Sequence, residues 1–304
     1  MTIGCIIQGD IRRGTSFVID NLTGIFDYVV LSTWEEHKDA IPSGKFQCIL
    51  NPKPINSGAA HRNYQRFSTA RGIDAAKTAG CTHILKWRTD MLPTKMSLSK
   101  LVEYANFSPP ENTKSRIVIP AFRNLSVNPD GFSSIPDLFS FGQIDEMERL
   151  WGDKGFDYSK NWNMSDSSLN NIEEKFVNSN RFTDVYCPEA ELYNLFKNRL
   201  NQDLDLKLVH KTIVENYFYL LNHNELGILW FAPKAGFRSV GQAWEHPWWT
   251  VRQWKNKSAK VYPLDHQYRG LVGRIRRKIS KHKVKKELSN QNSIWVKNFS
   301  DNLL

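Results

Sequence analysis

The segment Lys86-Trp87-Arg88-Thr89-Asp90 follows the apolar run His83–Leu85 and places charges of both signs at the end of an expected strand. Asp90 offers the hard oxygen ligand that divalent cations prefer, and Lys86 or Arg88 can offset phosphate charge directly. The segment therefore indicates a diphosphate site. Arg88 and Asp90 are equally typical of a surface salt bridge, which contributes little.

Six short apolar runs and one clear helix would position this segment. The helix is predicted at about Arg62–Ala79, with an apolar face of Phe67, Ala70, Ile73 and Ala76, and Gly80 is predicted to end it. The strands are predicted at Ile3–Ile7, Tyr28–Leu31, Gln47–Leu50, His83–Leu85, Ser115–Ile119 and Leu138–Phe141. Strands that alternate with helices predict an α/β fold with a Rossmann-type, mostly parallel sheet flanked by helices.

Ligands of such sheets bind beyond the carboxyl ends of the strands. The polar groups expected there are Gln8, Ser32, Thr33, Asn51, Arg88 and Asp90. No G-x-G-x-x-G follows the first strand and no Walker A motif occurs, so dehydrogenases and P-loop enzymes are disfavoured.

The composition is that of a folded protein. The 304 residues are 40% hydrophobic and 24% charged, which excludes disordered and fibrous classes. The four cysteines form no C-x-x-C pair and lie mostly in or beside apolar runs, which indicates a reducing compartment. No signal peptide and no apolar stretch of about 18 residues is visible, so we expect a cytoplasmic protein with at most peripheral membrane contact.

The net charge of +10 is concentrated in residues 271–288, which hold eight basic residues and one acid and so contribute +7. Apolar residues at helical spacing accompany these charges. A basic amphipathic helix is typical of a protein that binds anionic lipid surfaces. A solvated terminal helix is the other interpretation. Nucleic acid is not an expected partner, because no nucleic-acid-binding motif accompanies the charge.

Several short motifs, in this order and spacing, resemble the WavE family of bacterial lipopolysaccharide and polysaccharide biosynthesis proteins, which are GT-A-like glycosyltransferases. The matching pieces are Ile6-Ile7-Gln8-Gly9, Leu31-Ser32-Thr33-Trp34-Glu35, Asn63 to Gly72, Leu85-Lys86-Trp87-Arg88-Thr89-Asp90, Asp137 to Gly142, and Pro188-Glu189. The resemblance implies transfer of a sugar from a nucleotide-sugar donor to a growing, lipid-linked bacterial glycan.

The resemblance also implies a set of donor-binding residues. They are Gln8, Gly9, Thr33, Trp34, Asn51, Arg71, Lys86, Arg88 and Asp90. Asp90 would be the ligand of a divalent metal, Mn or Mg. The family's usual first acid of Asp-x-Asp is Arg88 here, which departs from the pattern for metal binding. His223, His246 or His266 could supply a second ligand, although a lone histidine is more often structural.

Inverting glycosyl transfer needs a general base for the acceptor hydroxyl. Glu189 is the first candidate, because it precedes an apparent helix whose N-terminus would keep the carboxylate ionised. Helix capping is its structural alternative. Asp137 is the second candidate, because it precedes a strand predicted to face the same cleft.

We expect residues 1–225 to form the catalytic domain and residues 226–304 a Trp-rich, basic, helical extension. Five of the ten tryptophans, from Trp230 to Trp254, fall within 25 residues. Such a cluster suits sugar stacking or a membrane interface, or equally a small hydrophobic core. The competing functions are a sugar nucleotidyltransferase and a non-catalytic adaptor that docks on membrane or nucleic acid through residues 271–288.

Overall fold

The computed structural model describes residues 1–12, 14–58, 61–93, 95–120, 135–156, 158, 188–204, 210–221, 226, 228–232 and 236–239. The basic segment 271–288, His223, His246, His266, Cys187 and the tryptophans from Trp244 to Trp254 lie outside these residues. Among the helices within these ranges, none is long and apolar enough to cross a membrane.

The core of the fold is a seven-stranded sheet in the order β3-β2-β1-β4-β7-β6-β8. Its strands are β1 (Ile3–Gln8), β2 (Tyr28–Trp34), β3 (Gln47–Asn51), β4 (His83–Arg88), β6 (Ile117–Pro120), β7 (Ser140–Gln143) and β8 (Phe218–Leu221). All neighbours pair in parallel except β7, which is antiparallel to β4 and to β6. The predicted α/β fold with a mostly parallel sheet is therefore confirmed.

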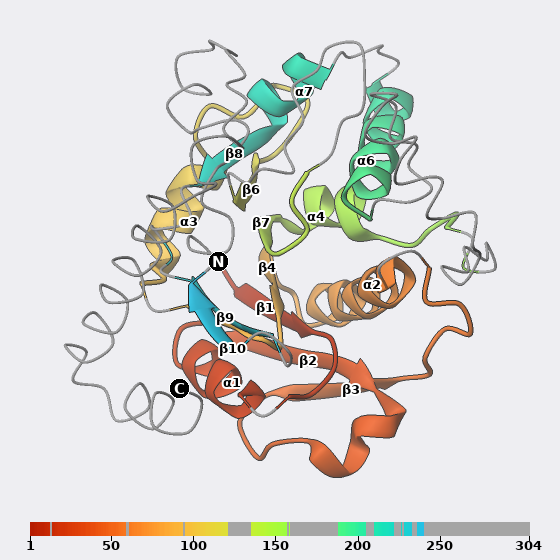
Figure 1. The fold of residues 1–304 in the computed structure, drawn as a ribbon. Helices are drawn as coiled ribbons and strands as arrows, with labels where there is room; N and C mark the ends of the chain where they lie inside the picture. Colours follow the sequence, from red (N-terminus) through yellow and green to blue (C-terminus); the bar gives the residue numbers. More distant parts are fainter. Residues whose placement is uncertain are drawn as a thin grey trace, which may run out of the picture.

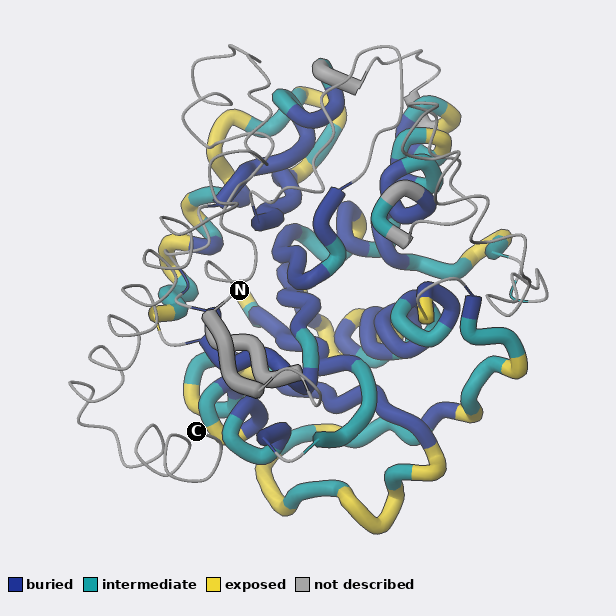
Figure 2. The backbone as a smooth tube through the Cα atoms, in the orientation of Figure 1, coloured by how far each residue is buried: buried dark blue, intermediate teal, exposed yellow. Residues whose placement is uncertain are grey.

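Helices cover both faces of this sheet (Figure 1). The helices α1 (Thr15–Thr23) and α3 (Leu98–Ala105) lie on one side, and α2 (Arg62–Thr78), α4 (Ile144–Trp151) and α6 (Pro188–Leu204) lie on the other. The remaining helices are the 3-10 helix η1 (Glu35–Ala40) and α7 (His210–Tyr217). Because β1 is flanked by helices on both faces, all six of its residues are buried, as the continuous apolar run Ile3–Ile7 predicts (Figure 2).

Helix α2 begins and ends within one residue of the prediction, but its buried face differs. Ala70, Ile73 and Ala76 are buried as expected, whereas Phe67 is only half-buried and contacts Tyr158 edge-on, with ring centroids 5.3 Å apart. Gly72 sets the distance between α2 and β1, because a Cβ there would lie 2.3 Å from Ile6 Cγ2. Close packing of α2 on β1 brings the N-terminus of α2 to the carboxyl end of β1.

A second, antiparallel sheet forms directly after Asp90. Its order is β10-β9-β5, made of β5 (Met91–Pro93), β9 (Ile228–Ala232) and β10 (Gly236–Ser239). Met91 pairs with Trp230 in this register. The backbone that leaves β4 is thus fixed on both sides of Asp90, by β1 before it and by β9 after it.

Candidate functional site

A pocket of about 260 Å³ lies at the carboxyl ends of β1, β2 and β4, beside the N-terminus of α2. This is the edge where parallel α/β sheets bind ligands. The pocket is lined by Gln8, Gly9, Asp10, Arg12, Trp34, Lys53, His61, Tyr64, Gln65, Arg88, Thr89, Asp90 and Asp137. Six of these were predicted from the sequence: Gln8, Gly9, Trp34, Arg88, Asp90 and Asp137.

Hydrogen bonds connect the ends of the three strands around Gly9. Gly9 has φ +119°, a conformation that side-chain-bearing residues rarely adopt, so glycine is required where the chain leaves β1. Its carbonyl accepts a hydrogen bond from Thr33 Oγ1 at 2.9 Å, and its N–H donates to the Ser32 carbonyl at 3.3 Å. Thr89 N–H donates to the Gln8 carbonyl at 3.2 Å. The floor of the pocket is therefore fixed by the sheet itself.

Asp90 organises two arginines in the lining of the pocket. Arg88 binds this carboxylate with two groups, Nε to Oδ1 at 2.9 Å and Nη2 to Oδ2 at 3.0 Å. Arg12 Nη1 lies 3.1 Å from Oδ2. Burial alone would lower the pKa of Arg88, but the charge of Asp90 and the hydrogen bonds to it raise the pKa above its ordinary value. The guanidinium group of Arg88 is therefore held in its charged form.

A second part of the lining is aromatic. Trp34 and Tyr64 lie with ring centroids 5.4 Å apart, and His61 stacks on Tyr64 at 5.8 Å. Lys53 Nζ lies 5.6 Å from the Trp34 ring and 5.2 Å from the Tyr64 ring, within the range of cation–π attraction. A flat, uncharged ring system is the ligand group that such a wall suits.

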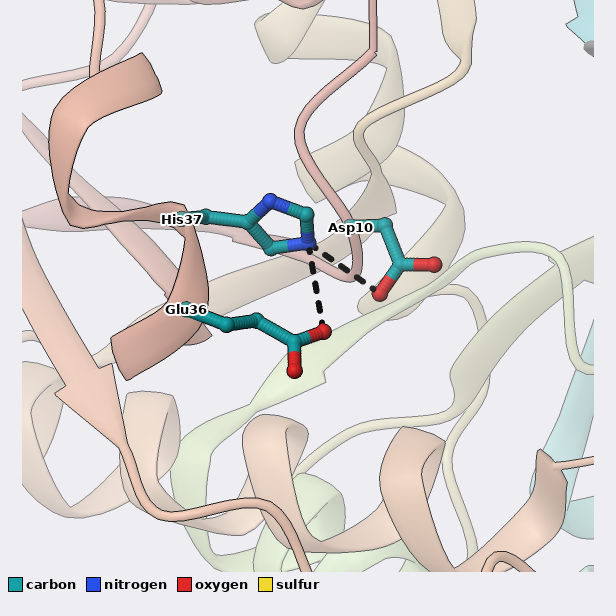
Figure 3. Close-up of side chains that lie close together, drawn as sticks. All are labelled: Asp10, Glu36 and His37. Atoms are coloured by element: carbon teal, nitrogen blue, oxygen red, sulfur yellow. Dashed lines mark ion pairs between the residues drawn. The ribbon is translucent and has the colours of Figure 1, made fainter.

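The side chains of Asp10, Glu36 and His37 converge, Asp10 from the loop after β1 and the other two from η1 (Figure 3). His37 Nε2 lies 3.6 Å from Asp10 Oδ1 and 3.9 Å from Glu36 Oε1. Lys53 forms an ion pair with Glu36 and lies 3.9 Å from Asp10 Oδ1, which also accepts a hydrogen bond from Trp34 Nε1 at 2.8 Å. Lys53 is thus the shared cationic partner of both acids, and of the three residues only Asp10 lines the pocket.

Asp137 reaches the pocket because β7 is antiparallel. Lys86 near the end of β4 pairs with Ser140 at the start of β7, so the residues before Ser140 lie at the carboxyl edge of the parallel strands. The Asp137 carbonyl accepts hydrogen bonds from Lys86 Nζ and, at 3.1 Å, from Gln65 Nε2. Among the described residues, the Asp137 carboxylate has no hydrogen bond or ion pair.

Lys86 lies behind the pocket rather than in its wall. Its side chain is fully buried, and Nζ lies 4.5 Å from the centroid of the Trp151 ring. Burial lowers the pKa of Lys86 to about 7; Asp137 and Asp90 act in the opposite direction, and Arg88 reinforces the lowering. Lys86 therefore supports the Asp137 backbone and titrates near neutral pH.

Five predicted residues do not line the pocket: Thr33, Asn51, Arg71, Lys86 and Glu189. Thr33 and Asn51 hold the strand ends, since Asn51 Nδ2 donates to Ser32 Oγ at 2.9 Å and to the Thr33 carbonyl at 2.8 Å. Arg71 lies elsewhere on α2, paired with Asp153 and, at 3.3 Å, with Asp74.

Glu189 is the second residue of α6, and its carbonyl accepts a hydrogen bond from the Ile135 N–H at 3.3 Å. Its neighbour Glu191 instead joins α6 to α2 through ion pairs with Arg62 and, at 3.8 Å, with Arg66. The donor-binding roles of Thr33, Asn51, Arg71 and Lys86, and the role of Glu189 as general base, stay predictions.

Sequence reasoning did not propose Arg12, Lys53, His61, Tyr64 or Gln65 as site residues. Arg12 could have been proposed as a site residue, because it is a basic residue in the loop directly after the first strand. Lys53 follows the third strand in the same manner. Tyr64 and Gln65 lie in the first turn of α2. The sequence predicted this helix from its apolar face, which does not show that its first turn lies beside a pocket.

The described residues do not fit a divalent metal at Asp90. Metal ions of the Mg²⁺ or Mn²⁺ type need open oxygen ligands, whereas both oxygens of Asp90 are bound to guanidinium groups and the residue is 1% exposed. The position that carries the first acid in the resembling family is Arg88.

Comparisons with known proteins do not assign the chain to a family. No protein-family model and no curated protein matches it. Among solved structures 191 chains match. One is the crystal structure of mannose-1-phosphate geranyltransferase from Thermus thermophilus, with a TM-score of 0.33 and 9% identity, over 49% of this chain and 60% of that chain. This chain thus spans less than two thirds of that protein, and the likeness is too low to inform function. WavE membership stays a prediction.

Proposed function

We propose that the protein is a glycosyltransferase that transfers a sugar from a nucleotide-sugar donor to a growing bacterial lipopolysaccharide or capsule-type glycan. The observation that supports this most is the pocket itself. Its lining combines aromatic side chains, two guanidinium groups, and one carboxylate, Asp137, that no described residue pairs with.

Each part of the pocket suits one part of such a donor. The ring of the base would stack on Tyr64 and Trp34. The backbone at Gly9 would approach the ribose closely, because glycine has no side chain there. Arg12 and Arg88 would bind the diphosphate with charge-assisted hydrogen bonds. The sugar would then lie toward Asp137.

In an inverting transfer, Asp137 would take the proton of the acceptor hydroxyl. The acceptor oxygen would form a bond to the anomeric carbon as the bond to the diphosphate oxygen breaks. The electron pair of that bond would leave with the nucleoside diphosphate, whose growing charge faces the two arginines.

A thermal-shift panel of nucleoside diphosphates and nucleotide sugars, with the four common bases, tests this function. A ligand that binds only the folded state stabilises it by about 2.7 kcal/mol at a hundredfold excess over Kd. We expect one nucleotide family to raise the melting temperature. Tyr64→Ala should reduce the affinity by about 5-fold to 150-fold, because stacking on a base contributes about 1–3 kcal/mol.

Phe107→Ala is the matched control, since Phe107 is an exposed aromatic residue that does not line the pocket. No shift with any nucleotide, or equal loss of affinity in both variants, would contradict the proposed function. The first outcome would favour the non-catalytic adaptor.

A further inference from the structure

Asp90 lies behind its two arginines when viewed from the pocket. Its side chain is 2% exposed, whereas the side chains of Arg12 and Arg88 are 27% and 23% exposed. All three residues line the pocket. A ligand that enters will therefore meet guanidinium groups first, and the carboxylate acts as the fixed counter-ion that holds them side by side.

The carboxylate has little capacity left for a metal ion. Two carboxylate oxygens offer about four lone-pair sites in total. Arg88 Nε, Arg88 Nη2 and Arg12 Nη1 lie 2.9, 3.0 and 3.1 Å from them. A divalent ion needs direct contact with an oxygen at about 2.0–2.6 Å, so it would have to displace an arginine while two positive charges repel it.

Asp10 and Glu36 share one cationic partner, Lys53. Asp10 accepts from Trp34 Nε1 and lies 3.9 Å from Lys53 Nζ, and Glu36 is paired with the same lysine. Among the described carboxylates that line the pocket, Asp137 alone could bind a divalent ion without breaking an ion pair, and one carboxylate supplies few of the oxygen ligands that such an ion needs.

We propose that the pocket binds the diphosphate of its ligand without a divalent metal, and that Arg12 and Arg88, held by Asp90, supply the positive charge. This inference rests on the proposed function and makes Arg12 a phosphate-binding residue of the site. It also departs from the metal role that the resemblance to GT-A enzymes implies for Asp90. The guanidinium groups suit the task, since each offers several donors in a fork that matches phosphate oxygens.

Isothermal titration with inorganic pyrophosphate and with the nucleotide that the thermal-shift panel selects tests the inference. Each titration is run with excess EDTA and with excess manganese. We expect the Kd of the nucleotide to differ by less than about threefold between the two conditions. Binding only in manganese would overturn the inference and leave the proposed function standing. Absence of nucleotide binding in both conditions would overturn both.

Arg12→Gln, titrated in EDTA, should weaken nucleotide and pyrophosphate binding by about tenfold to a hundredfold, the range expected when a hydrogen bond to a charged group is lost. Arg12→Lys keeps the charge without the fork, and we expect a smaller loss. Lys77→Gln removes the same charge from an exposed lysine paired with Glu148, and binding should not change. Unchanged binding in folded Arg12→Gln would overturn the inference, and thermal melting verifies the fold of each variant.

Discussion

Asp137 lies in the wall of the pocket, whereas Glu189 lies in the first turn of α6 and does not line it. The sequence favours Glu189 as the general base, because its position before a helix is visible in the pattern. The position of Asp137 depends on the direction of β7, which an apolar run such as Leu138–Phe141 does not encode. The geometry therefore favours Asp137.

Substituting each acid by its amide distinguishes the two candidates. Asp137→Asn should lower kcat by about 10²–10⁴, the usual contribution of a general base, while nucleotide affinity stays almost unchanged. Glu189→Gln should retain most of the activity. Steady-state kinetics of sugar transfer to an acceptor analogue measures both. If Glu189→Gln has the large effect and Asp137→Asn does not, the assignment must be exchanged.

The segment from Lys86 to Asp90 shows what residue patterns can and cannot predict. The pattern correctly places Arg88 and Asp90 at the mouth of the sheet. It cannot show that Lys86 is buried behind the wall of the pocket, because Lys86 and Arg88 share one face of the strand and differ only in what covers them. Asp137 and Trp151, which contact Lys86, come from distant parts of the chain. Arg12 is 78 positions away in the chain, so its approach to Asp90 follows only from the pairing of β1 with β4.

At the scale of elements, the junction of β4 and β7 depends on one buried amine. Lys86 donates to the Asp137 carbonyl at the point where the antiparallel strand begins. Short apolar runs predicted the existence of both strands well, because burial requires apolar residues in either direction. The antiparallel direction was not predicted, since it depends on long-range pairing.

The titration of Lys86 should be visible in protein stability. Burial lowers its folded-state pKa to about 7, whereas an unfolded lysine keeps the ordinary value of 10.5. Between these values the unfolded chain binds more protons, so stability rises with pH in that window. Lys86 alone should add about 2 kcal/mol to the free energy of unfolding between pH 7 and pH 9.

Urea denaturation of the wild type and of Lys86→Met at pH 7 and pH 9 measures this contribution. The increase should be about 2 kcal/mol smaller in the variant, and the thiols whose pKa burial raises, such as Cys5, affect both proteins equally. Lys77→Met, which removes an exposed lysine, should behave as the wild type. Parallel pH dependences in wild type and Lys86→Met would show that Lys86 stays protonated when folded.

At the scale of the whole molecule, we expect the described pocket to bind the donor and the basic segment 271–288 to bind the membrane. All groups assigned to the donor precede residue 200, and the segment carries +7 of the net +10. We propose, from sequence alone, that this segment holds the enzyme on the anionic inner face of the plasma membrane, where a lipid-linked acceptor would be found. The expected domain boundary near residue 225 stays a prediction.

A full-length variant with four substitutions in the segment tests this proposal. Arg274, Arg276, Lys285 and Lys286 change to Gln, which lowers the charge of the segment from +7 to +3. Because each basic residue near an anionic surface contributes on the order of 1 kcal/mol, binding to vesicles rich in phosphatidylserine should fall by about a thousandfold. Co-sedimentation at low and high salt measures this. High salt should weaken wild-type binding, because it screens exposed charges.

The control variant removes the same charge from four exposed lysines of the described region, Lys38, Lys45, Lys77 and Lys100. If binding depends on the local density of charge beside apolar residues, this control should sediment as the wild type does, since long-range attraction by net charge alone is screened within about 10 Å. Transfer to a water-soluble acceptor should be equal in all three proteins. Equal sedimentation of all three would mean that the segment serves another partner or the fold itself, and equal loss in both variants would mean that net charge alone attracts the protein to the membrane.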